Sequence, residues 1–126
     1  MKAPCQVVYW YLLPAMSSAL SRELVKLGMP QKKIALALGL TPAAVSQYLS
    51  RKRGKGIKLD KKTRAEITKL AKKIARKKMD ECDVMYEVCG ICAIARRSRS
   101  LCKMHKEMTN PRECYICMDT RSARRR

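Results

Sequence analysis

Apolar residues recur every three or four positions over most of the chain, which is the spacing of an amphipathic helix. Between residues 14 and 27 this spacing predicts one helix whose apolar face is formed by Met16, Leu20, Leu24 and Leu27. Residues 1–13 are apolar without a clear period, so the pattern leaves a strand and a buried helical turn open for them. We expect this segment to pack on the core of its own subunit or across a dimer interface.

Two short helices separated by a tight turn are predicted within residues 31–50. Their inward faces consist of small and apolar side chains: Ile34, Ala35 and Leu38 in the first helix, and Val45, Tyr48 and Leu49 in the second. Gly39 suits a left-handed turn, Thr41 suits an N-cap, and Pro42 suits the first turn of the second helix. The alternative is an ordinary amphipathic helix pair, but residues of the right type stand at every diagnostic position together.

A helix-turn-helix reads DNA by placing its second helix in the major groove while the first crosses the phosphate backbone. Gln47 can bond adenine through both atoms of its amide, and Ser46 can donate to or accept from a base. Gln31, Lys32 and Lys33 are expected to contact phosphate. The full set of predicted DNA-binding residues is Gln31, Lys32, Lys33, Thr41, Pro42, Ala43, Ala44, Ser46, Gln47, Arg51, Lys52 and Arg53.

The segment after this pair is strongly basic. Residues 51–60 read RKRGKGIKLD, which fits a loop that contacts phosphates or a solvated linker. Asp60 is a candidate N-cap for a helix over residues 61–79 whose apolar stripe is Ile67, Leu70, Ala71, Ile74 and Ala75. This helix either closes the DNA-binding domain or lies along a helix of a second subunit.

The charge of the chain points to a polyanionic partner. Twenty-nine Lys and Arg residues against 10 Asp and Glu residues give a formal net charge of +19. No stretch approaches the roughly 20 apolar residues of a membrane-spanning helix, so no membrane partner is predicted. The N-terminal apolar run lacks the basic leader and cleavage site of a signal peptide, and we expect a cytoplasmic, reducing location.

Cysteines accumulate in the last third of the chain at the spacing of metal ligands. The predicted metal ligands are Cys89, Cys92, Cys102, Cys114 and Cys117, with His105 as a possible further ligand. Two CxxC pairs can each supply two of the four ligands of a tetrahedral metal ion. An iron–sulfur cluster of the [4Fe-4S] type is the preferred cofactor, because the sequence shows no other evident sensor domain; structural Zn²⁺ is the alternative, and motif shape alone favours it. Cys5 and Cys82 are expected to be buried small hydrophobic residues.

The helix pair and its flanking segments resemble a known group. Residues 31–50 look like the helix-turn-helix of the lambda-repressor/Cro (Xre-like) class. Together with the N-terminal run PCQVVYWYLLP (residues 4–14) and the cysteine-bearing tail, they resemble a family of small archaeal predicted transcriptional regulators. The resemblance implies a homodimer that binds a pseudo-palindromic double-stranded DNA operator.

The sequence therefore predicts an all-α protein. Residues 1–79 would form the helix-turn-helix DNA-binding domain, residues 80–120 a cysteine-rich metal-binding module, beginning with a helix from Val84 to about Ser98, and residues 121–126 a disordered basic tail. The predicted function is transcription regulation tuned by an iron–sulfur cluster that senses redox state, oxygen or iron. A regulator with a purely structural zinc site and a zinc-containing RNA- or ribosome-associated protein are the alternatives. No catalytic constellation is present, so neither enzymatic activity nor a small-molecule substrate is expected.

Overall fold

The computed structural model describes Gln6 and residues 8–50, 58–77 and 79–97. The protein is all-α over these residues, as the apolar spacing predicts. One π-helical turn and five α-helices follow one another in the described chain: η1 (Val8–Leu12), α2 (Leu13–Lys26), α3 (Gln31–Leu38), α4 (Pro42–Leu49), α5 (Lys61–Arg76) and α6 (Glu81–Arg97).

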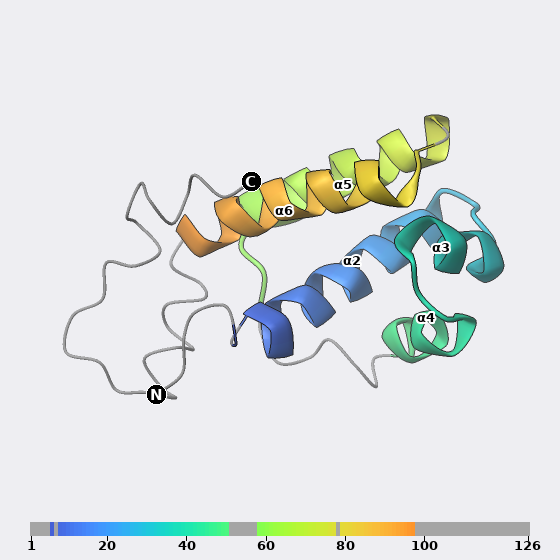
Figure 1. The fold of residues 1–126 in the computed structure, drawn as a ribbon, viewed down its shortest axis with the longest axis horizontal. Coiled ribbons are helices and arrows are strands. Elements are labelled where there is room, and N and C mark those ends of the chain that lie inside the picture. The colour runs from blue at the N-terminus through green and yellow to red at the C-terminus, as the bar shows by residue number, and fades with distance from the viewer. Residues whose placement is uncertain (1–5, 7, 51–57, 78, 98–126) are drawn as a thin grey trace.

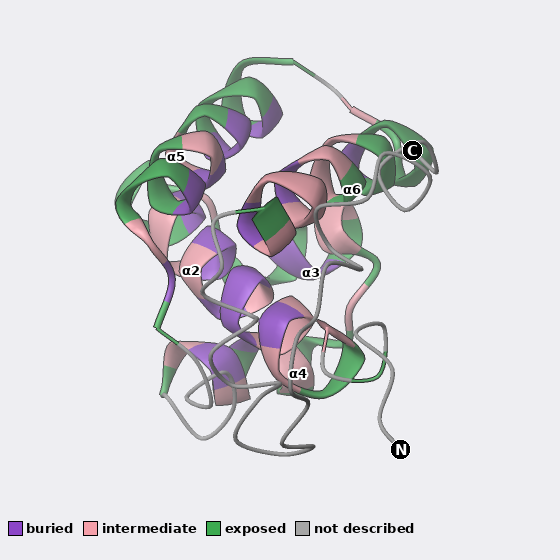
Figure 2. Ribbon diagram, turned by 90° about the vertical axis from the view of Figure 1, so that its left-hand side faces the viewer, coloured by how far each residue is buried: buried purple, intermediate pink, exposed green. Residues whose placement is uncertain are grey.

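Helix α2 is the central element of the fold. It contacts α3, α4 and α5, while α6 packs on α5 and α3 (Figure 1). Helices α4 and α5 lie on different sides of α2, as two perpendicular views show (Figures 1 and 2). Because α2 meets neighbours on several sides, its buried positions include two serines, Ser18 and Ser21, besides the predicted apolar face.

The inward faces of these helices form one hydrophobic core, which Figure 2 shows as the buried sides of the ribbons. Leu24, Ile34 and Val45 are completely buried in it. Helix α6 adds Val84 and Ile91 to the same core. Within the described residues, packing is therefore continuous across residue 80, where we expected a domain boundary. The rest of the predicted cysteine-rich module and the basic tail, residues 98–126, lie outside the described residues.

A glycine in the left-handed region ends α2. Gly28 has a φ of +86°, and its amide donates to the carbonyl oxygen of Val25 at 2.9 Å. The amide of Met29 donates to the carbonyl oxygen of Leu24 at 3.1 Å. This pair of bonds satisfies the last carbonyl groups of the helix and turns the chain sharply toward α3.

Polar side chains set the starts of α5 and α6 in different ways. Asp60 occupies the N-cap of α5 as predicted, but its carboxylate accepts from the hydroxyl of Thr63 and not from a backbone amide. Asp80 accepts from the amide of Asp83 at 2.8 Å, and Asp83 accepts in return from the amide of Asp80 at 3.4 Å. This reciprocal cap makes α6 begin at Glu81, three residues before the predicted start.

Two predicted core positions are wrong. Leu27 is 46% exposed, because α2 ends at Lys26 and the chain turns away from the core there. Ala75 is exposed, because it lies beside the buried stripe of α5, which ends at Ile74. The helix itself stops at Arg76, earlier than the predicted residue 79.

The described part of the N-terminal segment is helical. Val8–Leu12 forms a π-helical turn that continues directly into α2, and Leu12 is buried in the core. Tyr9 and Trp10 are 70% and 46% exposed. The segment is thus only partly covered by its own subunit.

Candidate nucleic-acid interface

The turn between α3 and α4 has the local geometry that the sequence predicts. Gly39 ends α3 in the left-handed region, with φ +65° and ψ +31°. The amide of Leu40 donates to the carbonyl oxygen of Ala35 at 2.9 Å, and that of Gly39 to Leu36 at 3.5 Å. These two backbone hydrogen bonds close the end of α3, and the chain reverses direction over residues 39–41.

Helix α4 begins with the predicted cap. The amide of Ala44 donates to the side-chain oxygen of Thr41 at 3.1 Å, which satisfies one free amide of the first turn. Pro42 occupies the first helical position, where no amide proton is needed. The start of α4 is therefore fixed by residues within a single turn of the chain.

The helix pair is anchored to α2 through apolar and polar contacts. Ile34 and Ala35 of α3 and Val45 and Tyr48 of α4 are buried. The hydroxyl of Ser18 in α2 donates to the carbonyl oxygen of Tyr48 at 3.2 Å. The pair thus presents only its outer faces to solvent.

Most of the predicted DNA-binding residues lie on those outer faces. The exposed ones are Gln31, Lys32 and Lys33 at the start of α3, Thr41, Pro42 and Ala43 at the start of α4, and Ser46 in its second turn. Arg51, Lys52 and Arg53 lie outside the described residues. The exposed sides of the two helices therefore offer small, polar or basic side chains to a partner.

Gln47 and Ala44 are less accessible than the prediction requires. Both are only partly exposed, and the side-chain oxygen Oε1 of Gln47 is buried without a hydrogen-bond partner among the described residues. A bidentate contact to adenine uses that oxygen together with the amide nitrogen. In this conformation Gln47 does not present both atoms, whereas Ser46 is exposed.

Leu36 is a surface residue that the sequence prediction missed. It is 79% exposed and lies on α3, on the same side as Lys32 and Lys33. The helical spacing could have revealed it, because position 36 falls opposite the buried face formed by Ile34 and Ala35. An exposed leucine beside two lysines adds an apolar contact to this basic surface.

Helix α5 carries a second basic surface. Its exposed basic residues are Lys61, Lys62, Arg64, Lys69, Lys72, Lys73, Arg76 and Lys77, the last at its C-cap. Its apolar stripe packs on α2 and α6 of the same chain, which favours the interpretation that it closes the core. Because α4 and α5 lie on different sides of α2, this charge is separate from the face of α4 (Figure 1).

Three cysteines are described, all of them on α6. Cys89 is exposed and Cys92 is partly buried, one helical turn further on. The prediction that Cys82 is buried is wrong: it is exposed, because α6 turns Val84 and Ile91 toward the core and its other side outward. Cys5, Cys102, His105, Cys114 and Cys117 lie outside the described residues.

The described cysteines fit half of a tetrahedral site. A spacing of three residues puts Cys89 and Cys92 side by side on the helix, as two ligands of one metal require. Within the described ranges no three His, Cys, Asp or Glu side chains come close enough together to hold a metal ion. The other predicted ligands lie outside the described residues.

Comparisons with known proteins found no relative: no family model, no curated protein and no solved structure matches this chain. No helix among the described residues is both long enough and apolar enough to cross a membrane.

Proposed function

We propose that this protein is a transcriptional regulator that binds double-stranded DNA through α3 and α4, in the manner of an Xre-like helix-turn-helix. One observation carries the proposal: the capped first turn of α4 is exposed while its opposite face is buried against α2. A helix held in this way can enter a major groove with its N-terminal side chains foremost. The net charge of +19 supplies the attraction to phosphate.

The roles within the interface follow from exposure. Ser46 bonds a base edge, and Ala43 contacts a thymine methyl group. Lys32 and Lys33 contact phosphates beside α4. Gln47 joins the base contacts only if its side chain rotates to expose Oε1, which has no hydrogen bond to lose among the described residues.

The active form is a homodimer, since one helix of this length reads only half of an operator. Exposed aromatic side chains at Tyr9 and Trp10 offer apolar surface for contact with a second copy. Sedimentation equilibrium with and without operator DNA measures this state. A monomer on an operator half-site would contradict it.

A metal centre anchored by Cys89 and Cys92 tunes this activity. The preferred cofactor is an iron–sulfur cluster, which supplies a response to redox state, oxygen or iron; Zn²⁺ is the alternative and would be structural. Helix α6, which carries both cysteines, packs on α3. A structural change at the metal centre would therefore reach the DNA-binding helices through the direct contact between α6 and α3.

The test compares two aspartates introduced on opposite surfaces. Ala43→Asp places a carboxylate on the exposed start of α4, and Ala65→Asp places one on the exposed face of α5. Both change the net charge equally. A binding site is first selected from random duplex DNA, and affinities are then measured by fluorescence anisotropy. We expect Ala43→Asp to weaken binding at least about 10-fold, because one lost or repelled base contact costs roughly 1–3 kcal/mol.

The Ala65→Asp variant should retain nearly the affinity of the unchanged protein. Lys32→Ala should weaken binding to all duplexes alike and reduce the salt slope by about 1, whereas Lys72→Ala on α5 should do neither. If no sequence is enriched, or if both aspartate variants lose affinity equally, α4 is not the reading helix. Equal competition by duplex RNA would favour the RNA-associated alternative.

A further inference from the structure

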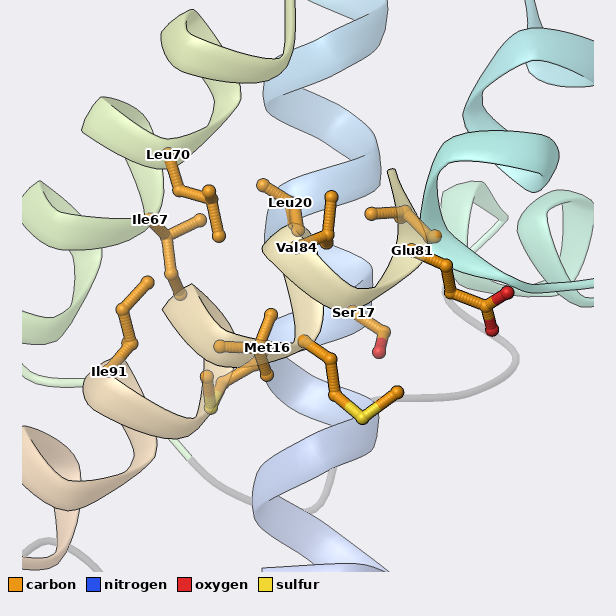
Figure 3. Close-up of a pocket in the computed structure, with 11 residues that line it drawn as sticks. Met16, Ser17, Leu20, Ile67, Leu70, Glu81, Val84 and Ile91 are labelled. Carbon is orange, nitrogen blue, oxygen red and sulfur yellow. The ribbon is translucent and has the colours of Figure 1, made fainter. Parts of the chain in front are cut away.

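A pocket lies between α2, α3, α5 and α6 and has a volume of about 140 Å³ (Figure 3). Its inner wall consists of almost completely buried side chains: Met16, Leu20, Ile67, Leu70, Val84 and Ile91. Its rim consists of more accessible side chains: Ser17, Leu38, Glu81, Met85 and Val88. The pocket is therefore apolar inside, with one hydroxyl and one carboxylate at its edge.

The size and lining of the pocket suit a small apolar group. Apolar cavities of about 150 Å³ stay dry and accept molecules as large as benzene. Met16 and Met85 add flexible thioether side chains, which adapt to irregular ligands. A water molecule in the inner part would lack polar partners, so an organic group is favoured there over solvent.

Glu81 makes one end of the pocket anionic. In Figure 3 its carboxylate lies at the edge and points away from Ile67 and Leu70. Among the described residues it forms no hydrogen bond or ion pair. Every other described acidic side chain has a partner: Glu23 pairs with Lys26, Glu66 with Lys69, Glu87 with Lys73, Asp60 with Thr63, and Asp80 and Asp83 with each other's amides.

Glu81 is exposed and lies in the first turn of α6, where the helix dipole stabilises a carboxylate. Basic side chains are abundant, yet none of the described ones pairs with Glu81. Because Glu81 lies beside an apolar pocket, its carboxylate is accessible to a ligand that carries both a cationic group and an apolar group. The cationic group of such a ligand would pair with Glu81 while its apolar group filled the pocket.

The same side chain touches the turn between α3 and α4. A Cβ atom added at Gly39 would collide with the carboxylate of Glu81, so the two residues are in close contact. Leu38, the last residue of α3, also lines the pocket. A ligand that moved Glu81 or Leu38 would act directly on the segment that orients α4.

We propose that this pocket binds a small organic cation, with an apolar body about the size of a benzene ring between α2, α5 and α6 and an amine at Glu81. The site is distinct from the cysteines of α6, because none of the described cysteines lines the pocket. Occupancy shifts the turn at Gly39 and thereby changes DNA affinity; this second step rests on the proposed function.

Binding is tested on the full-length protein with benzylamine as the probe and benzyl alcohol as its neutral counterpart, by titration followed with heteronuclear NMR. We expect both to shift resonances of the pocket residues, and benzylamine to bind about two- to five-fold more tightly, as an accessible ion pair allows. Glu81→Gln should abolish this preference. Glu66→Gln, which removes an equal charge from a side chain that does not line the pocket, should leave it unchanged.

Ser17→Leu should fill the pocket and weaken both probes together, with thermal unfolding recorded to verify that the variant is folded. The proposal is overturned if neither probe binds the unchanged protein, or if Glu81→Gln binds both probes as the unchanged protein does. DNA affinity is then measured with and without benzylamine. Absence of any DNA binding would refute the proposed function and leave the pocket standing; unchanged affinity with bound probe would refute the coupling alone.

Discussion

The hydroxyl of Ser18 donates a hydrogen bond to the backbone carbonyl oxygen of Tyr48, thirty residues away, over 3.2 Å. Ser18 is completely buried, and the bond joins the middle of α2 to the last turn of α4. Arg22 donates to the same hydroxyl at 2.7 Å. Ser18 therefore acts as both donor and acceptor at the point where the proposed reading helix is attached to the core.

Replacing Ser18 with alanine should lower the free energy of unfolding by about 1–3 kcal/mol, because a buried carbonyl loses its side-chain donor and Arg22 loses its acceptor. Urea denaturation followed by circular dichroism measures the change. Ser21→Ala is the matched control. Ser21 is also completely buried, but its hydroxyl has no hydrogen-bond partner among the described residues, so its loss should leave stability unchanged or slightly raised. Equal losses in the two variants would contradict the assigned role of the Ser18 bond.

Gly39→Ala should destabilise the protein by about 1–2 kcal/mol, because the left-handed conformation at φ +65° disfavours a Cβ atom. The new methyl group would also displace the carboxylate of Glu81. Gly28→Ala separates the two effects, since Gly28 has a φ of +86° but no atom within 4 Å of the added Cβ. Thermal and urea unfolding of both variants measure the difference.

The loss should be larger at Gly39 than at Gly28, and replacing Glu81 with alanine in the Gly39→Ala protein should remove the excess. If the excess survived without the Glu81 side chain, the contact between Gly39 and Glu81 would not be its cause. DNA affinity of the same variants reports whether this turn orients α4.

Local chemistry explains why much of the helix pair could be predicted from sequence. The left-handed glycine at Gly39, the cap at Thr41 and the proline at Pro42 each depend on residues within one turn. The buried faces of α3 and α4 follow from helical spacing alone. Whether these helices bind DNA stays a prediction, because binding depends on a partner as well as on the fold.

The features that could not be predicted depend on tertiary packing. The exposure of Cys82 and the burial of the Gln47 side-chain oxygen are set by the helices that pack beside them. The position of α6 in the main core likewise depends on its contacts with α3, which is distant in sequence, as well as with the preceding helix α5. The pocket at Glu81 arises only where four helices meet, so no single segment encodes it.

The three cysteines of α6 differ in their expected contribution to the metal centre. At a rise of about 1.5 Å per residue, Cys89 and Cys92 are separated by about 4.5 Å along the helix, and Cys82 and Cys89 by about 10.5 Å. Only the first pair can share one metal or one cluster edge. Cys89→Ser and Cys92→Ser should therefore each lose most of the bound metal, whereas Cys82→Ser, which alters an exposed thiol on the same helix, should retain it.

Metal and acid-labile sulfide are measured in protein purified without oxygen, together with the visible absorption spectrum. Iron with stoichiometric sulfide and a brown colour supports the cluster, and these should disappear together in the Cys89 and Cys92 variants. A colourless protein containing stoichiometric zinc would refute the cluster and leave a structural centre, since zinc carries no redox response. If Cys82→Ser lost as much metal as Cys89→Ser, the assignment of Cys89 and Cys92 as the ligand pair would be contradicted. Cys82 and Cys89 are separated by two helical turns, so they cannot both hold a single tetrahedral ion.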